Sequence, residues 1–108
     1  MATARLDANA ITDWDTFHSM CAAELGFPDF YGRNMDAFND CLNYIDEGDG
    51  MSRFHLKPGE ILVIEVPGWA DLNKRLPEIA QALIECVAFV NENNVEDGKP
   101  PLIALVLC

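Results

Sequence analysis

Asp36 and Asp40 are the side chains whose type and spacing first suggest chemistry. They stand four residues apart, so on a helix they lie on one face, with Asn39 beside them. Two neighbouring carboxylates can act as general acid and base, hold a hard cation, or meet the basic side chains of a partner. As a purely structural choice the pair is mildly unfavourable, because like charges at this spacing repel by roughly a few tenths of a kcal/mol.

The rest of the sequence gives little support to catalysis or metal binding. No apolar pocket that would raise the pKa of one carboxyl group is visible, and no Ser-His or Cys-His pairing or phosphate-binding glycine loop is present. Asp36, Asp40 and Asn39 alone make a weak cation site, and His18 and His55 complete no metal-ligand spacing. We therefore expect no enzyme and no cofactor, with a metal-dependent hydrolase as the most remote alternative.

Negative charge is concentrated in the same region. The chain holds 18 acidic and 7 basic residues, for a net charge of -11. Such a chain repels nucleic-acid phosphates and attracts basic proteins, although acidity also serves solubility. Residues 24–49 contain seven acids and one base, which is -6 of the -11. Solubility does not require this concentration, so a basic protein partner is favoured.

The totals predict a single domain over residues 1–108, without linkers or repeats. No apolar run is long enough to span a membrane, and "MATARLDANA" is not a signal peptide, so we expect a cytoplasmic protein. The four cysteines are widely spaced and are expected to be reduced thiols, buried except for Cys108.

Hydrophobic periodicity and turn residues predict an α/β fold, a three-stranded parallel sheet packed with about four helices. Thr12 or Asp13 is expected to cap the first helix, and Gly26 with Pro28 to end it. The strand at 61–66 is expected to be buried. The predicted strands are 3–7, 61–66 and 102–107, and the predicted helices are 12–25, 34–46, 71–76 and 77–93.

The helix at 34–46 divides into two faces. Met35, Phe38, Cys41, Leu42 and Ile45 fall on an apolar face that suits packing on the sheet. The opposite face carries Asp36, Asn39, Asp40 and Asn43. Spacing alone leaves open whether this polar face is a binding surface or merely solvated.

The loop before this helix adds aromatic side chains beside the acidic face. Pro28 fixes a bend, and Gly32 can take a positive φ or allow close approach by a partner. We expect Tyr31 to cover the core and Phe30 to be available for binding. Aromatic anchors next to oriented charge are typical of protein interfaces.

The segment "FPDFYGRNMDAFNDCL" closely resembles the segment that marks the barstar family of intracellular ribonuclease inhibitors. The likeness continues more weakly through the rest of the chain, and the family's three-stranded parallel sheet with surrounding helices agrees with the predicted fold. The residues that keep the family's pattern are Pro28, Tyr31, Gly32, Asn34, Asp36, Ala37, Asp40, Cys41 and Leu42.

The resemblance implies a mechanism in which the second helix and its preceding loop block the active site of a basic ribonuclease. The aspartate that matches Asp40 takes the place of a substrate phosphate in the enzyme. The aspartate that matches Asp36 pairs with a basic residue of the enzyme near the rim of the active site. The surrounding partner-binding positions are Phe30, Gly32, Asn34, Met35, Asn39 and Asn43.

Three positions depart from the family's pattern, and a fourth is matched only by alignment. Phe30 replaces a tyrosine, Asn39 a tryptophan and Arg33 an acid, while an interface acid of the long helix aligns with Asn91, next to Glu92. Two functions therefore remain open. One is inhibition of a basic ribonuclease, and the other is a non-inhibitory interaction module that docks a different basic protein.

Overall fold

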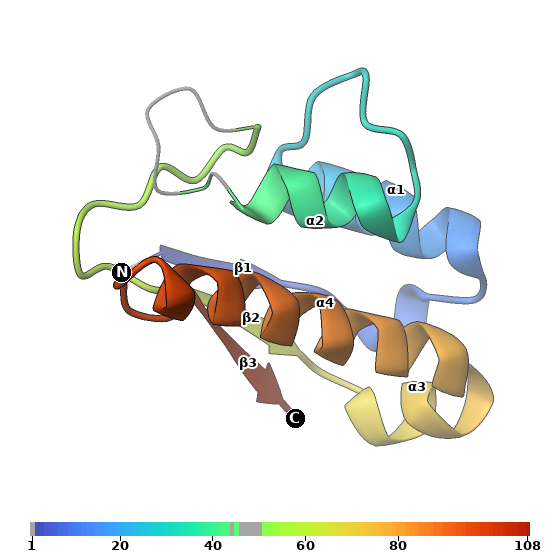
Figure 1. Ribbon diagram of the computed structural model, residues 1–108. Helices are drawn as coiled ribbons and strands as arrows, with labels where there is room; N and C mark the ends of the chain where they lie inside the picture. Colours follow the sequence, from blue (N-terminus) through green and yellow to red (C-terminus); the bar gives the residue numbers. More distant parts are fainter. Residues whose placement is uncertain (1, 44, 46–50) are drawn as a thin grey trace.

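The computed structural model describes residues 2–43, 45 and 51–108 (Figure 1). Three parallel strands form one sheet in the order β1 (Ala2–Arg5), β2 (Leu62–Val66) and β3 (Ile103–Leu107). The predicted α/β fold with a three-stranded parallel sheet and four helices is confirmed. In the described residues the helices are α1 (Trp14–Leu25), α2 (Met35–Asn43), α3 (Trp69–Arg75) and α4 (Pro77–Glu96), with a short 3-10 turn, η1, at Ala8–Ala10.

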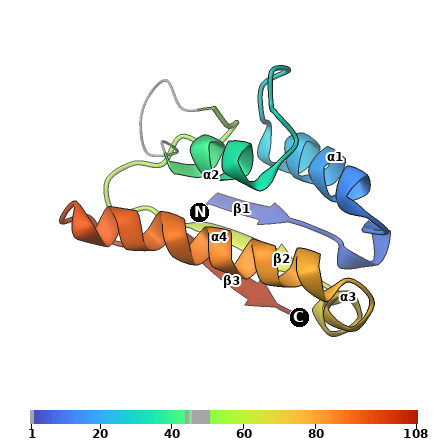
Figure 2. The same cartoon turned by 45° about the vertical axis from the view of Figure 1, so that its right-hand side comes forward.

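In the described part of the chain, one face of the sheet is packed by helices and the other is open. Both views show α4 crossing in front of the sheet, with α1 and α2 above it (Figures 1 and 2). Strand β2 alternates accordingly, so Val63 and Glu65 are only half-buried. The expectation of a strand buried throughout is wrong at these two positions, because a single layer of helices covers only alternate residues. The buried strand residues are Ala4, Leu62, Ile64, Val66 and Ile103, and the exposed ones include Thr3, Arg5, Ala104 and Val106.

Local signals set both ends of α1. Asp13 Oδ1 accepts a hydrogen bond from the Thr16 backbone N–H (2.8 Å), and Thr16 Oγ1 accepts one from the Asp13 N–H (3.1 Å). This capping box starts the helix two residues after the predicted beginning at Thr12. Gly26 ends it with φ 65°, and a Cβ at Gly26 would lie 2.6 Å from Arg53 Cβ. Conformation and packing therefore both require glycine there.

Other boundaries shift by a few residues. Helix α4 starts at Pro77 as predicted and continues to Glu96, and α3 starts two residues before the predicted position 71. Helix α2 ends at Asn43 rather than near 46, although positions 44 and 46 lie outside the described residues. Ile45 is in a turn, where its carbonyl accepts the Leu56 N–H (2.9 Å). None of the described helices is both long and apolar enough to cross a membrane.

Candidate partner-binding site

Helix α2 has a buried side and an exposed side, as predicted. Phe38 is fully buried, and its ring packs against Phe17 and Phe27, with centroid separations of 6.0 and 5.8 Å. These contacts fix the rotation of the helix about its axis. Asp36 and Asp40 consequently lie on the exposed side.

Neither Asp36 nor Asp40 has a hydrogen-bonding or ion-pair partner for its carboxylate within the described residues. Their charges nonetheless contribute to the raised pKa values of two buried thiols. Burial, and secondarily the charge of Asp40, raises the pKa of Cys41 to about 11. Burial and then Asp36 raise the pKa of Cys86 to about 12. The raised pKa keeps both thiols protonated at neutral pH, so neither adds a thiolate charge to the buried side of α2.

The loop before α2 is anchored by Tyr31 and presents Phe30. The Tyr31 N–H bonds to the Pro28 carbonyl (2.9 Å), and the buried Tyr31 hydroxyl lies 2.7 Å from His18 Nδ1. Tyr31 therefore covers the core, as expected. The Phe30 side chain is 76% exposed, so its ring is available to a partner.

Arg33, not Gly32, takes the positive φ in this loop, at 54°. Of the two roles that the sequence left open for Gly32, it does not adopt the positive φ. A Cβ at Gly32 would lie 3.3 Å from Ala37 Cβ, so glycine here permits close approach to the first turn of α2.

The charge of Arg33 is directed to α1 and not to the acidic face. Its Nη2 donates to Asp15 Oδ1 (2.6 Å), the Asp15 carbonyl (2.9 Å) and Ser19 Oγ (3.0 Å). The departure at Arg33 thus ties the loop to α1. It forms no ion pair with Asp36 or Asp40.

The other predicted site residues divide by their contacts. Asn34 is exposed, but its Oδ1 accepts the Ala37 N–H (2.8 Å) and so caps α2. Asn39 is half-buried against α4, where its Oδ1 faces Cys86 Sγ at 3.9 Å. Met35 and Asn43 are also half-buried. The exposed members with no helix-capping role are thus Phe30, Gly32, Asp36 and Asp40.

A groove between α2 and α4 adds residues that the sequence did not indicate. It is lined by α2 residues and by Ala82, Glu85, Cys86 and Phe89 of α4. Phe89 is an aromatic residue of α4 that is 51% exposed. An aromatic residue at this position was the one sequence signal for a binding surface on α4. The groove itself forms only because α2 packs beside α4.

The side chain of Asn91, which aligns with an interface acid of the family, is bonded to the backbone at the start of β3. Its Nδ2 donates to the Ile103 carbonyl (2.9 Å), and its Oδ1 accepts the N–H groups of Leu102 and Ile103 (3.0 Å each). Asn91 therefore joins α4 to the start of β3. Glu85 is an acid of α4 that lines the groove beside α2.

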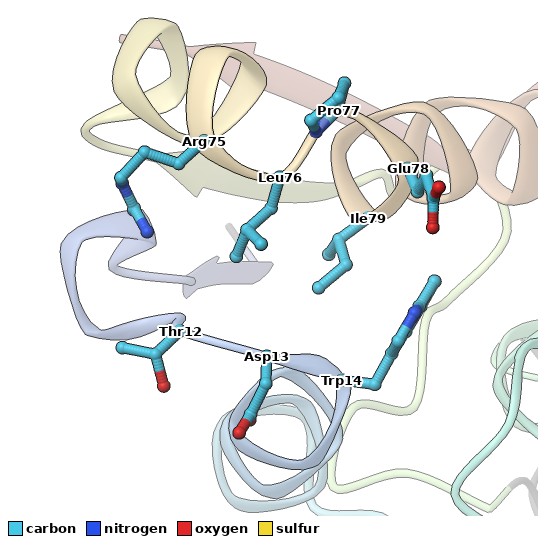
Figure 3. Close-up of a pocket in the computed structure, with 8 residues that line it drawn as sticks. All are labelled: Thr12, Asp13, Trp14, Arg75, Leu76, Pro77, Glu78 and Ile79. Atoms are coloured by element: carbon cyan, nitrogen blue, oxygen red, sulfur yellow. The ribbon is translucent and has the colours of Figure 1, made fainter.

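A second hollow lies where the start of α1 meets the junction of α3 and α4. Figure 3 shows Trp14, Leu76 and Ile79 around it. The Arg75 guanidinium at its edge is already bound by Asp71 and by the carbonyls of Ala8 and Ile11. In the described residues, no three His, Cys, Asp or Glu side chains gather into a metal site.

Comparison with known proteins identifies a family. A family model described as Barstar (barnase inhibitor) matches residues 1–106. A search of curated proteins finds no significant match. The family model spans nearly the whole chain, including the sheet, α2 and its preceding loop. The chain therefore belongs to the barstar family, whose members inhibit a ribonuclease and are not themselves enzymes.

Proposed function

We propose that this chain inhibits a basic ribonuclease by placing α2 and the loop before it over the enzyme's active site. The observation that carries the proposal concerns Asp36 and Asp40, whose carboxylates have no partner within the described residues. They lie on the exposed side of a helix whose other side is fixed in the core. Asp40 takes the position of a substrate phosphate, and Asp36 pairs with a basic residue nearer the rim. Phe30 supplies apolar contact beside them.

Rigidity of the site favours tight binding. Phe38 is locked by two ring contacts, Tyr31 is held by His18, and Asn34 caps the helix. A surface that is ordered before binding loses less conformational entropy when the complex forms. The net charge of -11 steers the chain towards a basic partner and away from nucleic acid, so association should slow as salt rises.

Inhibition kinetics test the proposal directly. Barnase and other basic bacterial ribonucleases would be titrated with the chain while RNA cleavage is followed. The proposal predicts inhibition competitive with RNA, because the inhibitor occupies the phosphate site. Tight binding that leaves cleavage unchanged would refute active-site blocking, and no binding to any of these enzymes would refute the choice of partner.

Asn39 supports a second candidate, a non-inhibitory module that docks a basic protein of another kind. Its side chain is half-buried and directed to Cys86, so α2 offers little apolar surface at this position. Partners captured from cell extract would separate the two functions, since the module would return a basic protein without nuclease activity. Either function is proposed for a single domain, residues 1–108, acting in the cytoplasm.

A further inference from the structure

The groove between α2 and α4 combines an apolar lining with an acidic rim. Met35, Ala82, Cys86 and Phe89 supply the apolar atoms. Asp36 stands on the α2 side and Glu85 on the α4 side, and none of the described residues that line the groove is a lysine or an arginine.

We propose that this groove receives an apolar side chain of the partner that is flanked by a lysine or arginine. The inference rests on the proposed function, because it assigns the same basic partner a second contact beside Asp36. It also identifies Phe89 and Glu85 as residues that select among basic partners.

The apolar part of the occupant follows from the lining. Half of the Phe89 side chain is exposed, and contact with another apolar group would remove that surface from water. Asn39 offers little to a polar occupant of the groove, because its Oδ1 already accepts from the Cys86 thiol. Exposed aromatic surface in a concave setting is characteristic of interface hot spots.

The basic part follows from charge complementarity. Asp36 forms no ion pair within the described residues, and Glu85 accepts a hydrogen bond only from Gln81 Nε2 (3.0 Å) there. An acidic neighbour on the occupant would be repelled from both walls. The hollow of Figure 3 has no such preference, since its lining mixes Arg75 with Asp13 and Glu78.

Three capped dipeptides can test the groove without a ribonuclease. Acetyl-phenylalanyl-lysine amide carries both features, acetyl-phenylalanyl-glutamate amide reverses the charge, and acetyl-alanyl-lysine amide lacks the ring. Binding would be followed by NMR from the methyl signals of Met35 and Ala82. We expect saturable shifts with the first peptide, and affinity at least about tenfold weaker for the other two. Equal affinities, or no shift with any peptide, would overturn the inference.

Matched variants locate the site. Phe89→Ala and Glu85→Gln should each weaken binding of the phenylalanyl-lysine peptide several-fold. Val95→Ala should not, because Val95 is an equally exposed apolar residue of α4 outside the groove. If Val95→Ala weakens binding as much as Phe89→Ala, the groove is not the binding site.

Ribonuclease binding separates this inference from the proposed function. Where a ribonuclease is inhibited, Phe89→Ala should speed dissociation of the complex several-fold while inhibition at saturating concentration persists. Inhibition that depends on Asp40 but not on Phe89 would overturn only the groove. Peptide binding in the groove without inhibition of any ribonuclease would overturn only the proposed function.

Discussion

The Nδ1 atom of His18 lies 2.7 Å from the hydroxyl oxygen of Tyr31, which joins α1 to the loop that presents Phe30. His18 is buried and stacks on Trp14, with ring centroids 5.8 Å apart. Burial, followed by the positive charge of Arg33, lowers the pKa of His18, against a smaller opposite effect of Asp15. The fold therefore favours the neutral imidazole.

This lowered pKa predicts a loss of stability in mild acid. Above the ordinary pKa of 6.5, His18 is neutral in both the folded and the unfolded chain. As the pH falls from 6.5 through the lowered folded pKa, the unfolded chain binds the proton first, so the free energy of unfolding decreases. Urea unfolding between about pH 7.5 and pH 5 would measure the slope. His18→Gln should flatten it, and the exposed-site control His55→Gln should not. A wild-type slope in His18→Gln would contradict this assignment.

Arg33 affects stability in two opposite ways: its ion pair with Asp15 stabilises the fold, and its positive φ destabilises it. Arg33→Ala removes an exposed ion pair with Asp15 and should lower the free energy of unfolding by about 1 kcal/mol. Arg33→Gly should lose less, because φ 54° costs a residue with a Cβ about 1 kcal/mol. Equilibrium urea unfolding compares the two. The interpretation fails if the glycine variant is the less stable one.

Asn91 is predicted to be a structural residue. Asn91→Asp keeps an acceptor for the Leu102 and Ile103 N–H groups but sets a carboxylate against the Ile103 carbonyl. The free energy of unfolding should fall by about 1–3 kcal/mol, since a half-buried hydrogen-bonding group loses its partner. Glu92→Gln, at the exposed neighbouring position, should change it by less than about 0.5 kcal/mol. Unchanged stability with stronger partner binding in Asn91→Asp would instead return Asn91 to the interface.

Phe30 and Phe38 offer a matched test of which aromatic binds and which folds. Phe38→Ala should lower the free energy of unfolding by about 3–5 kcal/mol, because it removes a fully buried ring. Phe30→Ala should change it by less than about 0.5 kcal/mol and weaken binding to a ribonuclease. Thermal unfolding and titration calorimetry would measure the two effects. A Phe30→Ala variant that unfolds as easily as Phe38→Ala would show that Phe30 is a core residue.

Features with a local physical cause were predictable from the sequence. Helix α1 begins after Asp13 and ends at Gly26, because a capping side chain and a left-handed residue each act within one turn of the helix. The division of α2 into two faces followed from helical spacing, and it correctly separated Phe38 from Asp40.

Features that depend on contacts between distant segments were not predictable in the same way. Asn91 bonds to β3 and Arg33 bonds to α1, and neither contact between distant segments could be read from the sequence. The α2–α4 groove is lined by both Met35 and Phe89, which stand 54 positions apart in the sequence. The partner-binding roles of the exposed α2 residues stay predictions.

The most direct test of ribonuclease inhibition compares Asp40→Asn with Glu96→Gln. Both changes remove one negative charge from an exposed position and leave the side-chain size nearly unchanged. Dissociation constants would be measured for a ribonuclease that the wild-type chain inhibits. We predict a loss of roughly 2–5 kcal/mol for Asp40→Asn, since a basic active site loses the anion that it holds, and little change for Glu96→Gln. A loss below about 1 kcal/mol for Asp40→Asn, or equal losses for the two variants, would contradict the placement of Asp40 in the active site.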